Sequence, residues 1–162
     1  MPETRRLCSF LVDELLFGID VANVQEVVRH HALTPIPLAP PSIRGLMNLR
    51  GHIVAAIDLR RRLGIGAASE GVRRANVILR SDHDSVSLLV DEIGDVIEVG
   101  AESFEAPPET LRGTARELIV GAYKLPERLL LVLDVERTIN VSTEATASPG
   151  RSSAVAGASR GD

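Results

Sequence analysis

The chain has 162 residues, 44% of them hydrophobic and 25% charged, which is typical of a globular protein with one domain or with two small units that share a core. A net charge of −4 and only four aromatic residues argue against nucleic acid as a partner, since such a site needs basic charge and stacking rings. One cysteine excludes an intramolecular disulfide, and no apolar run approaches the length of a membrane span.

The chain is predicted to begin with a β-hairpin. Apolar residues at 7–12 and 15–19 flank Asp13 and Glu14, which indicates two strands joined by a two-residue turn. Cys8 lies within the first strand, where a small buried side chain is expected rather than a reactive thiol.

A short helix and a stiff loop are expected next. Asp20 can cap a helix in which Val21, Val24 and Val28 recur at helical spacing. Four prolines within residues 34–42 then remove backbone donors and fix φ, which predicts an extended, semi-rigid connection.

The most informative stretch is a second hairpin. Polar and apolar residues alternate over 43–49, which is the period of a strand, and Gly51 allows the chain to reverse. Residues 53–57 form a continuous apolar run, so we expect a strand buried on both faces. Asp58 ends this strand and caps a helical turn, which in turn ends at Gly64.

The pattern of this hairpin recurs 76 residues later, which indicates two copies of one folding unit. The second copy also opens with a predicted hairpin (75–80 and 86–90), and its later hairpin covers 118–125 and 129–134. The matching pairs are Gly45 and Gly121, Leu49 and Leu125, Ile53 and Leu129, Val54 and Leu130, Ile57 and Leu133, Asp58 and Asp134, Arg61 and Arg137, and Leu63 and Ile139.

About five short strands per copy are enough to close a small barrel, which removes exposed sheet edges. We therefore predict a mainly β fold of two barrels packed through a shared aliphatic layer. The predicted domain covers residues 7–140, with one subdomain over 7–65 and the other over 74–140, separated by the small residues of 66–71. Residues 141–162 are rich in Ser, Ala, Thr and Gly, and a disordered tail is expected there.

The residues offer little chemistry. The four histidines have no second ligand at metal-site spacing, so neither a metal nor a cofactor is expected. Asp58 and Asp134 are expected to cap helical turns rather than to act as a catalytic pair. The arginines at 60–62 and at 73–74 are expected to form a solvated face. A small β-barrel enzyme and an RNA-binding double barrel remain alternatives, the latter with residues 60–62 as its footprint.

Several motifs together resemble the CheW family of chemotaxis coupling proteins, and the likeness runs from about Leu7 to Asn140. They are Phe17-Gly-Ile-Asp-Val21, Val24-Gln-Glu-Val27, Pro35-Ile-Pro37, Ile43-Arg-Gly45, Asn48-Leu-Arg-Gly51, Asp58-Leu59 and Leu131-Val-Leu-Asp134.

This resemblance implies two five-stranded, SH3-like barrels and a cytoplasmic adaptor without catalysis, attached to membrane-bound receptor arrays by protein contacts. It would link the cytoplasmic tips of chemoreceptors to the regulatory domain of a CheA-type histidine kinase, in a flagellar pathway or in one that controls pili or a second messenger. The receptor surface implied by the motifs consists of Val24, Glu26, Gly45, Asn48, Arg50 and Gly51. The kinase surface implied in the same way includes Val27 and Arg44.

Overall fold

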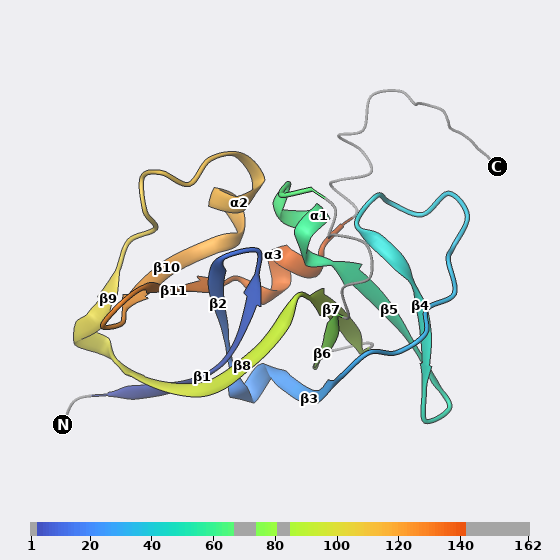
Figure 1. The fold of residues 1–162 in the computed structure, drawn as a ribbon, viewed down its shortest axis with the longest axis horizontal. Coiled ribbons are helices and arrows are strands. Elements are labelled where there is room, and N and C mark those ends of the chain that lie inside the picture. Colours follow the sequence, from blue (N-terminus) through green and yellow to red (C-terminus); the bar gives the residue numbers. More distant parts are fainter. Residues whose placement is uncertain (1–2, 67–73, 81–84, 142–162) are drawn as a thin grey trace.

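A computed structural model describes residues 3–66, 74–80 and 85–141, and these residues form a mainly β fold with short helices (Figure 1). The strands are β1 (Thr4–Val12), β2 (Leu15–Asp20), β3 (Val24–Val28), β4 (Ile43–Leu49), β5 (His52–Asp58), β6 (Ala75–Leu79), β7 (Val86–Val90), β8 (Glu92–Gly100), β9 (Phe104–Glu105), β10 (Ile119–Lys124) and β11 (Leu129–Leu133). The helices are η1 (Val21–Asn23), α1 (Leu59–Leu63), η2 (Ala101–Ser103), α2 (Gly113–Leu118) and α3 (Val135–Ile139). The predicted fold class is confirmed.

The strands form two sheets. One has six strands in the order β8-β1-β2-β11-β10-β9, and the other has five in the order β3-β6-β7-β5-β4. All neighbouring strands are antiparallel except β5 with β7 and β11 with β2. The six-stranded sheet has one strand more than predicted, because two residues of β9 pair with β10.

The two sheets do not follow the predicted division between 7–65 and 74–140. The hairpin β1–β2 joins the sheet built by the second repeat, and the hairpin β6–β7 joins the sheet built by the first. The reason lies in four pairings that cross between the repeats, namely β3 with β6, β8 with β1 and the two parallel pairs. The first hairpin of each repeat therefore belongs to the sheet that contains the later hairpin of the other repeat.

The internal repeat is confirmed at the level of single residues. The register of each later hairpin shifts just before a glycine, between Ile43 and Gly45 and between Ile119 and Gly121. A carboxylate then caps each following helix. Asp58 accepts a hydrogen bond from the Arg60 amide, and Asp134 accepts one from the Arg137 amide.

The helix predicted after Asp20 is mostly wrong. Asp20 does cap a single 3-10 turn, because its Oδ1 accepts from the Ala22 amide at 2.9 Å. Residues 24–28, however, form β3, which pairs with β6 in antiparallel register. Three of these five residues are valines, whose branched side chains favour strands, and the pairing with β6 outweighs their helical spacing.

The other predicted hairpins are confirmed. Val12 pairs with Leu15 across the first turn, where Asp13 has φ +61°. β6 pairs with β7, although their turn at 81–84 lies outside the described residues. β10 pairs with β11 as predicted. The helix α2 was not predicted.

The buried apolar side chains of the described residues form three clusters. The largest lies between the sheets and takes side chains from both, including Phe10 and Phe17 from one and Ile57 and Val77 from the other. This is the shared aliphatic layer that the sequence predicted. One smaller cluster lies within each sheet unit. Cys8 is buried, and burial raises the pKa of its thiol. The boundary predicted at 66–71 and the tail predicted at 141–162 fall outside the described residues except at Gly66 and Val141.

Candidate functional site

The β4–β5 hairpin ends in a tight turn whose geometry is set by two residues. Arg50 and Gly51 both have positive φ, at +52° and +85°, which is the pairing found in two-residue turns that match strand twist. The side chain of Asn48 secures the turn, because its Oδ1 accepts from the Gly51 amide at 2.9 Å. The turn thus holds Arg50 at the tip of the hairpin.

Arg50 forms a two-pronged ion pair with Glu26 of β3. Nη1 lies 2.5 Å from Oε2, and Nη2 lies 2.7 Å from Oε1. β3 and β4 are the two outer strands of the five-stranded sheet, so this contact requires the sheet to curl until its edges meet. The ion pair therefore closes the barrel at the end where the hairpin turns.

The ion pair remains in contact with solvent. The Arg50 side chain is 68% exposed and that of Glu26 is 23% exposed. Hydrogen bonding from Arg50 holds the pKa of the Glu26 carboxyl below its usual range, and the same contact raises the pKa of Arg50. At neutral pH both groups are charged and satisfy each other, so Arg50 is not a free cation.

An exposed apolar side chain lies beside this pair. Ile53 is 61% exposed and sits opposite Asn48 in the hairpin register. The sequence predicted a strand buried on both faces here, and that prediction is wrong for Ile53. The missed signal was the turn itself, since a two-residue turn places Ile53 on the same outward face as Asn48.

Ile53 and Arg50 also line a surface hollow of about 540 Å³. The hollow continues to Gln25 of β3 and to Ser85, whose hydroxyl donates to the Gln25 side chain at 3.2 Å. Glu26, Asn48, Arg50, Gly51 and Ile53 are called the hairpin end below. This patch joins one apolar side chain to a preformed ion pair, a combination suited to binding protein.

Two residues of the implied receptor surface lie apart from the hairpin end. Gly45 is buried, and a Cβ on it would lie 2.6 Å from the carbonyl oxygen of Thr34. Its close neighbour is thus the protein's own loop, where Thr34 and Leu46 exchange backbone hydrogen bonds of 2.8 Å. Val24 is half-buried against the main core.

The two residues of the implied kinase surface are accessible. Val27 is 39% exposed on β3, and Arg44 is exposed on β4. Arg44 follows the proline-rich loop by two residues, so it lies toward the other end of the hairpin from Arg50.

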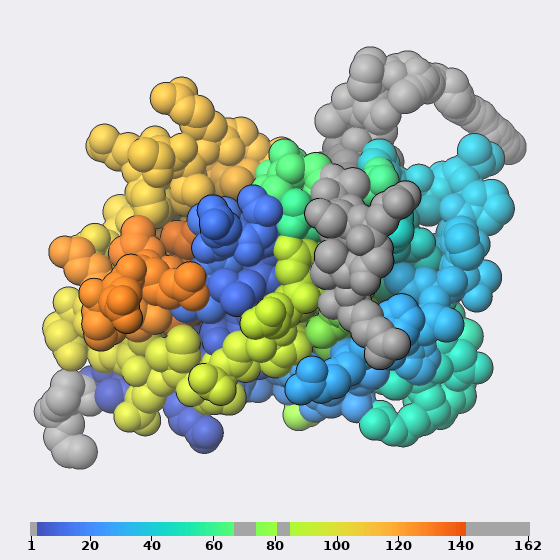
Figure 2. All heavy atoms as spheres, viewed as in Figure 1, coloured from blue at the N-terminus to red at the C-terminus, as the bar shows by residue number. Residues whose placement is uncertain are grey.

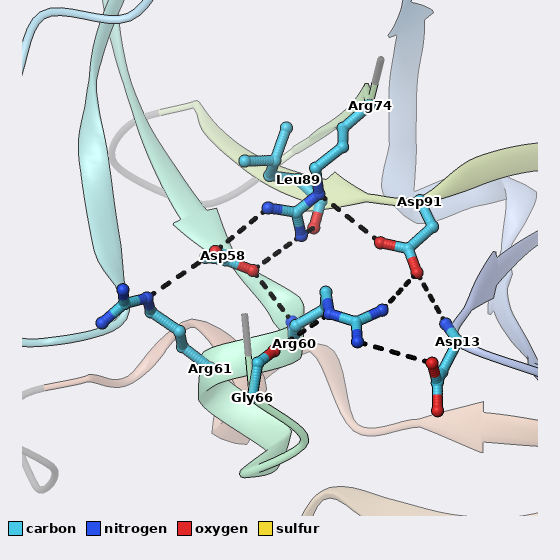
Figure 3. Close-up of polar contacts among 8 residues, drawn as sticks. All are labelled: Asp13, Asp58, Arg60, Arg61, Gly66, Arg74, Leu89 and Asp91. Carbon is cyan, nitrogen blue, oxygen red and sulfur yellow. Dashed lines mark hydrogen bonds and ion pairs between the residues drawn. The ribbon is translucent and has the colours of Figure 1, made fainter. Parts of the chain in front are cut away.

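A buried ionic cluster joins the two sheet units and was not predicted (Figure 3). Arg74 donates to both oxygens of Asp58, at 2.7 and 3.1 Å. Arg60 donates to Asp91 at 2.6 Å, and the Asp13 amide donates to the same carboxylate oxygen at 2.7 Å. Asp13 belongs to the β1–β2 turn, so these contacts connect that turn to the end of β5.

The predicted solvated face of arginines is confirmed for Arg61, which is exposed, and is wrong for Arg60, Arg62 and Arg74, while Arg73 lies outside the described residues. The Arg60 side chain is only 12% exposed. Arg62 is buried and donates to the carbonyls of Thr138 and Arg137 at 3.0 and 2.7 Å, at the end of α3. These contacts also remove two of the three arginines from any nucleic-acid footprint.

Asp58 shows why this cluster is stable. Burial alone raises the pKa of its carboxyl, but the hydrogen bonds and charge of Arg74, together with the backbone amides of Arg61 and Arg60, outweigh burial and hold the pKa below its usual range. The carboxylate is therefore a structural anion fully occupied by partners. The enzyme alternative could use Asp58, Asp134 or the histidines, and the geometry of Asp58 gives it no support.

The three described histidines lie in loops or near a turn and are at least partly exposed. His30 and His52 are exposed, His31 Nε2 lies 3.1 Å from the Asn48 carbonyl, and His83 falls outside the described residues. Within residues 3–66, 74–80 and 85–141, no group of three or more His, Cys, Asp or Glu side chains is placed to hold a metal ion. In the same ranges no helix has the length and apolar character needed to cross a membrane.

Comparison with known families decides the identity of the fold. The family model for the CheW-like domain matches residues 6–143. The chain belongs to the CheW family. Its function is therefore that of a chemotaxis adaptor, a scaffold that couples chemoreceptors to a CheA-type kinase.

Individual CheW relatives agree with this assignment. The chain is 32% identical over 139 residues to the chemotaxis protein CheW of Treponema pallidum, covering 83% of this chain and 82% of the relative. It is 33% identical over 124 residues to CheW of Klebsiella aerogenes, covering 76% and 75%. The crystal structure of the scaffolding protein TtCheW from Thermoanaerobacter tengcongensis superposes with a TM-score of 0.75 at 30% identity, covering 88% of this chain and 95% of that one.

Proposed function

We propose that the hairpin end is the surface on which this CheW-family adaptor receives the cytoplasmic tip of a chemoreceptor. The observation that carries the proposal is the Arg50–Glu26 ion pair, which fixes an exposed arginine beside the exposed Ile53. In this proposal Val24 and Gly45 support the surface without touching the receptor. Val24 packs against the main core, and Gly45 lets the loop at Thr34 approach β4.

The chemistry of the proposed contact follows from the exposed apolar surface of Ile53 and from the donors of Arg50 that do not bind Glu26. A receptor helix can lay an apolar side chain on Ile53, whose burial is favourable. Both Nη atoms of Arg50 already bind Glu26, so the arginine contributes its remaining donors and its apolar stem rather than an unpaired charge. Such a held guanidinium loses little freedom when a partner binds.

The kinase contact is proposed elsewhere on the same barrel, at Val27 and Arg44, which leaves the hairpin end free for the receptor. An adaptor that holds both partners is bound to membrane-anchored receptor arrays through protein contacts alone and works on the cytoplasmic side without a catalytic step. The same surfaces serve a flagellar pathway or one that controls pili or a second messenger.

Binding measured by calorimetry tests the proposal, with the receptor tip and the kinase regulatory domain of the same organism as partners. Ile53→Ser and Arg50→Ala are each expected to weaken receptor binding at least tenfold, which corresponds to about 1.4 kcal/mol, and to leave kinase binding unchanged.

A matched control is available in the second repeat. Arg128 lies in the β10–β11 turn, as Arg50 lies in the β4–β5 turn, and it is also exposed. Arg128→Ala is expected to bind the receptor like the wild type. Equal receptor affinity for folded Ile53→Ser, Arg50→Ala and wild type would show that the receptor binds another surface.

A further inference from the structure

The loop between β3 and β4 contains a leucine in a backbone conformation that leucine disfavours. Pro37 and Leu38 are the central residues of a turn in which the Ala39 amide donates to the Ile36 carbonyl at 3.4 Å. Leu38 has φ +62°. Proline followed by a residue of positive φ is the pattern of a type II turn, where glycine or asparagine normally occupies the second central position. A leucine there is strained by its own Cβ.

The strained side chain is also completely exposed. Leu38 has a relative exposure of 103%, the highest of any large hydrophobic residue among those described. Folding therefore gains nothing from this leucine, because it buries no apolar surface and its backbone is unfavourable. A residue that costs stability and packs against none of the described residues is a candidate for contact with another chain.

The loop around Leu38 is stiff and uncharged. Residues 34–41 are Thr-Pro-Ile-Pro-Leu-Ala-Pro-Pro, without an ionisable side chain. The prolines fix φ at four positions, so little conformational freedom remains to be lost when a partner binds. An uncharged, preorganised turn with a leucine at its tip fits an apolar socket that itself carries no charge.

The position of the turn separates it from the hairpin end. The Ile43 amide donates to the Pro40 carbonyl at 2.9 Å, and the Asp58 amide donates to the Ser42 carbonyl at 2.7 Å. These bonds tie the loop to the start of β4, whereas Arg50 follows the end of that strand. At about 3.3 Å per residue, the strand places the two sites roughly 20 Å apart. Figure 1 shows the loop and the β4–β5 turn at opposite ends of the hairpin, and Figure 2 shows the loop (cyan) projecting from the edge of the molecule.

We propose that Leu38 is a preorganised anchor that inserts into an uncharged apolar socket on the kinase regulatory domain. This inference rests on the proposed function, which places the receptor at the hairpin end and leaves this end of the barrel for the second partner. Arg44 lies next to the loop in sequence and extends the same contact. A single exposed leucine is too little apolar surface to hold a protein on a membrane, which favours a protein socket.

The test compares the full chain with Leu38→Asn, Leu38→Met and, as a matched control, Leu15→Asn, since Leu15 is also exposed (39%). Asparagine accepts positive φ, so Leu38→Asn is expected to raise Tm by about 2–4 °C. The same variant is expected to weaken binding of the kinase regulatory domain at least tenfold while leaving binding of the receptor tip unchanged. Leu38→Met, which keeps an apolar side chain, and Leu15→Asn are expected to bind the kinase domain within twofold of wild type.

The outcomes separate this inference from the proposed function. If wild type binds the kinase domain and Leu38→Asn binds it equally well, the anchor is overturned and the proposed function stands. The anchor is also overturned if Leu38→Asn loses only receptor binding, self-association in sedimentation, or binding to vesicles with anionic lipid. If wild type binds neither the kinase domain nor the receptor tip, the proposed function fails, and the anchor fails with it.

Discussion

Arg50 combines an unfavourable backbone conformation with a side chain that binds both carboxylate oxygens of Glu26. Its positive φ is disfavoured for a residue with a Cβ, yet the turn places its guanidinium within reach of both oxygens of Glu26. The ion pair thus offsets part of the cost of the backbone conformation that the turn imposes on Arg50. Leu38 has a similar backbone conformation, but its fully exposed side chain makes no comparable contact among the described residues.

At Asp58 the prediction concerns stability. Asp58→Asn removes the anion that both Nη atoms of the buried Arg74 bind, so we expect a loss of about 3 kcal/mol in the free energy of unfolding, measured by urea denaturation. Asp134→Asn is the control from the second repeat. Asparagine can also cap α3, and the lost ion pair joins Asp134 to an exposed arginine at 3.7 Å, so the expected loss is below about 1 kcal/mol. Equal losses at the two positions would contradict the importance of Arg74.

The pH dependence follows from the direction of the same pKa shift. The pKa of Asp58 is lower in the folded protein than in the unfolded chain, so its stabilisation is complete above the unfolded value of about 4 and is lost as the pH falls through the folded value. Stability measured from pH 6 to pH 2 should therefore decline more steeply for wild type than for Asp58→Asn. Parallel curves would mean that Asp58 does not titrate as inferred.

At the scale of elements, hydrophobic patterning identified most strands and failed where long-range pairing decided the outcome. Alternation over residues 43–49 and the apolar blocks of the first hairpin depend on local geometry, and both predictions are confirmed. Val24 to Val28 carried a helical spacing of valines, but their pairing with β6 depends on residues some fifty positions away. The same holds for the site, where Asn48 and Gly51 were predictable from a turn motif, whereas the contact of Arg50 with Glu26 was not predicted and depends on two outer strands meeting.

The repeated glycines allow a prediction about the two later hairpins. A Cβ at Gly45 would meet the Thr34 carbonyl oxygen at 2.6 Å, and one at Gly121 would meet the Glu105 carbonyl oxygen at 2.7 Å. Because backbone atoms cannot rotate away, Gly45→Ala and Gly121→Ala are each expected to cost about 1–3 kcal/mol in guanidinium unfolding.

Gly51→Asn serves as the control for these substitutions. Nothing lies within 4 Å of a Cβ at that position, and asparagine tolerates the positive φ, so the free energy of unfolding should change little. Alanine at Gly45 or Gly121 without measurable cost would show that the neighbouring loops move aside freely.

For the whole molecule, the exchange of hairpins makes the two sheet units one cooperative system. β3 needs β6, and β8 needs β1, so neither unit is complete within one half of the sequence. The main core and the ionic cluster around Asp58 and Asp91 add contacts across the same boundary. Thermal unfolding followed by circular dichroism and by calorimetry should therefore show one transition, with equal calorimetric and van't Hoff enthalpies.

Cleaving the sequence tests the same point. Fragments covering 1–66 and 67–162 should each lack cooperative unfolding, and their mixture should recover it. A folded, cooperatively melting fragment would contradict the interdependence of the two units.

The crossed pairings have a consequence for the history of the chain. A polypeptide with a single repeat would have a first hairpin without a sheet to join and a sheet with an unpaired edge strand. Two identical copies would pair all of these strands if they exchanged their first hairpins. Two such copies joined head to tail would have the present architecture. Joining them would also allow the two halves to differ, as they do near their hairpin tips, where the first half pairs Arg50 with Glu26 and the second pairs Lys124 with Glu105 at 2.9 Å.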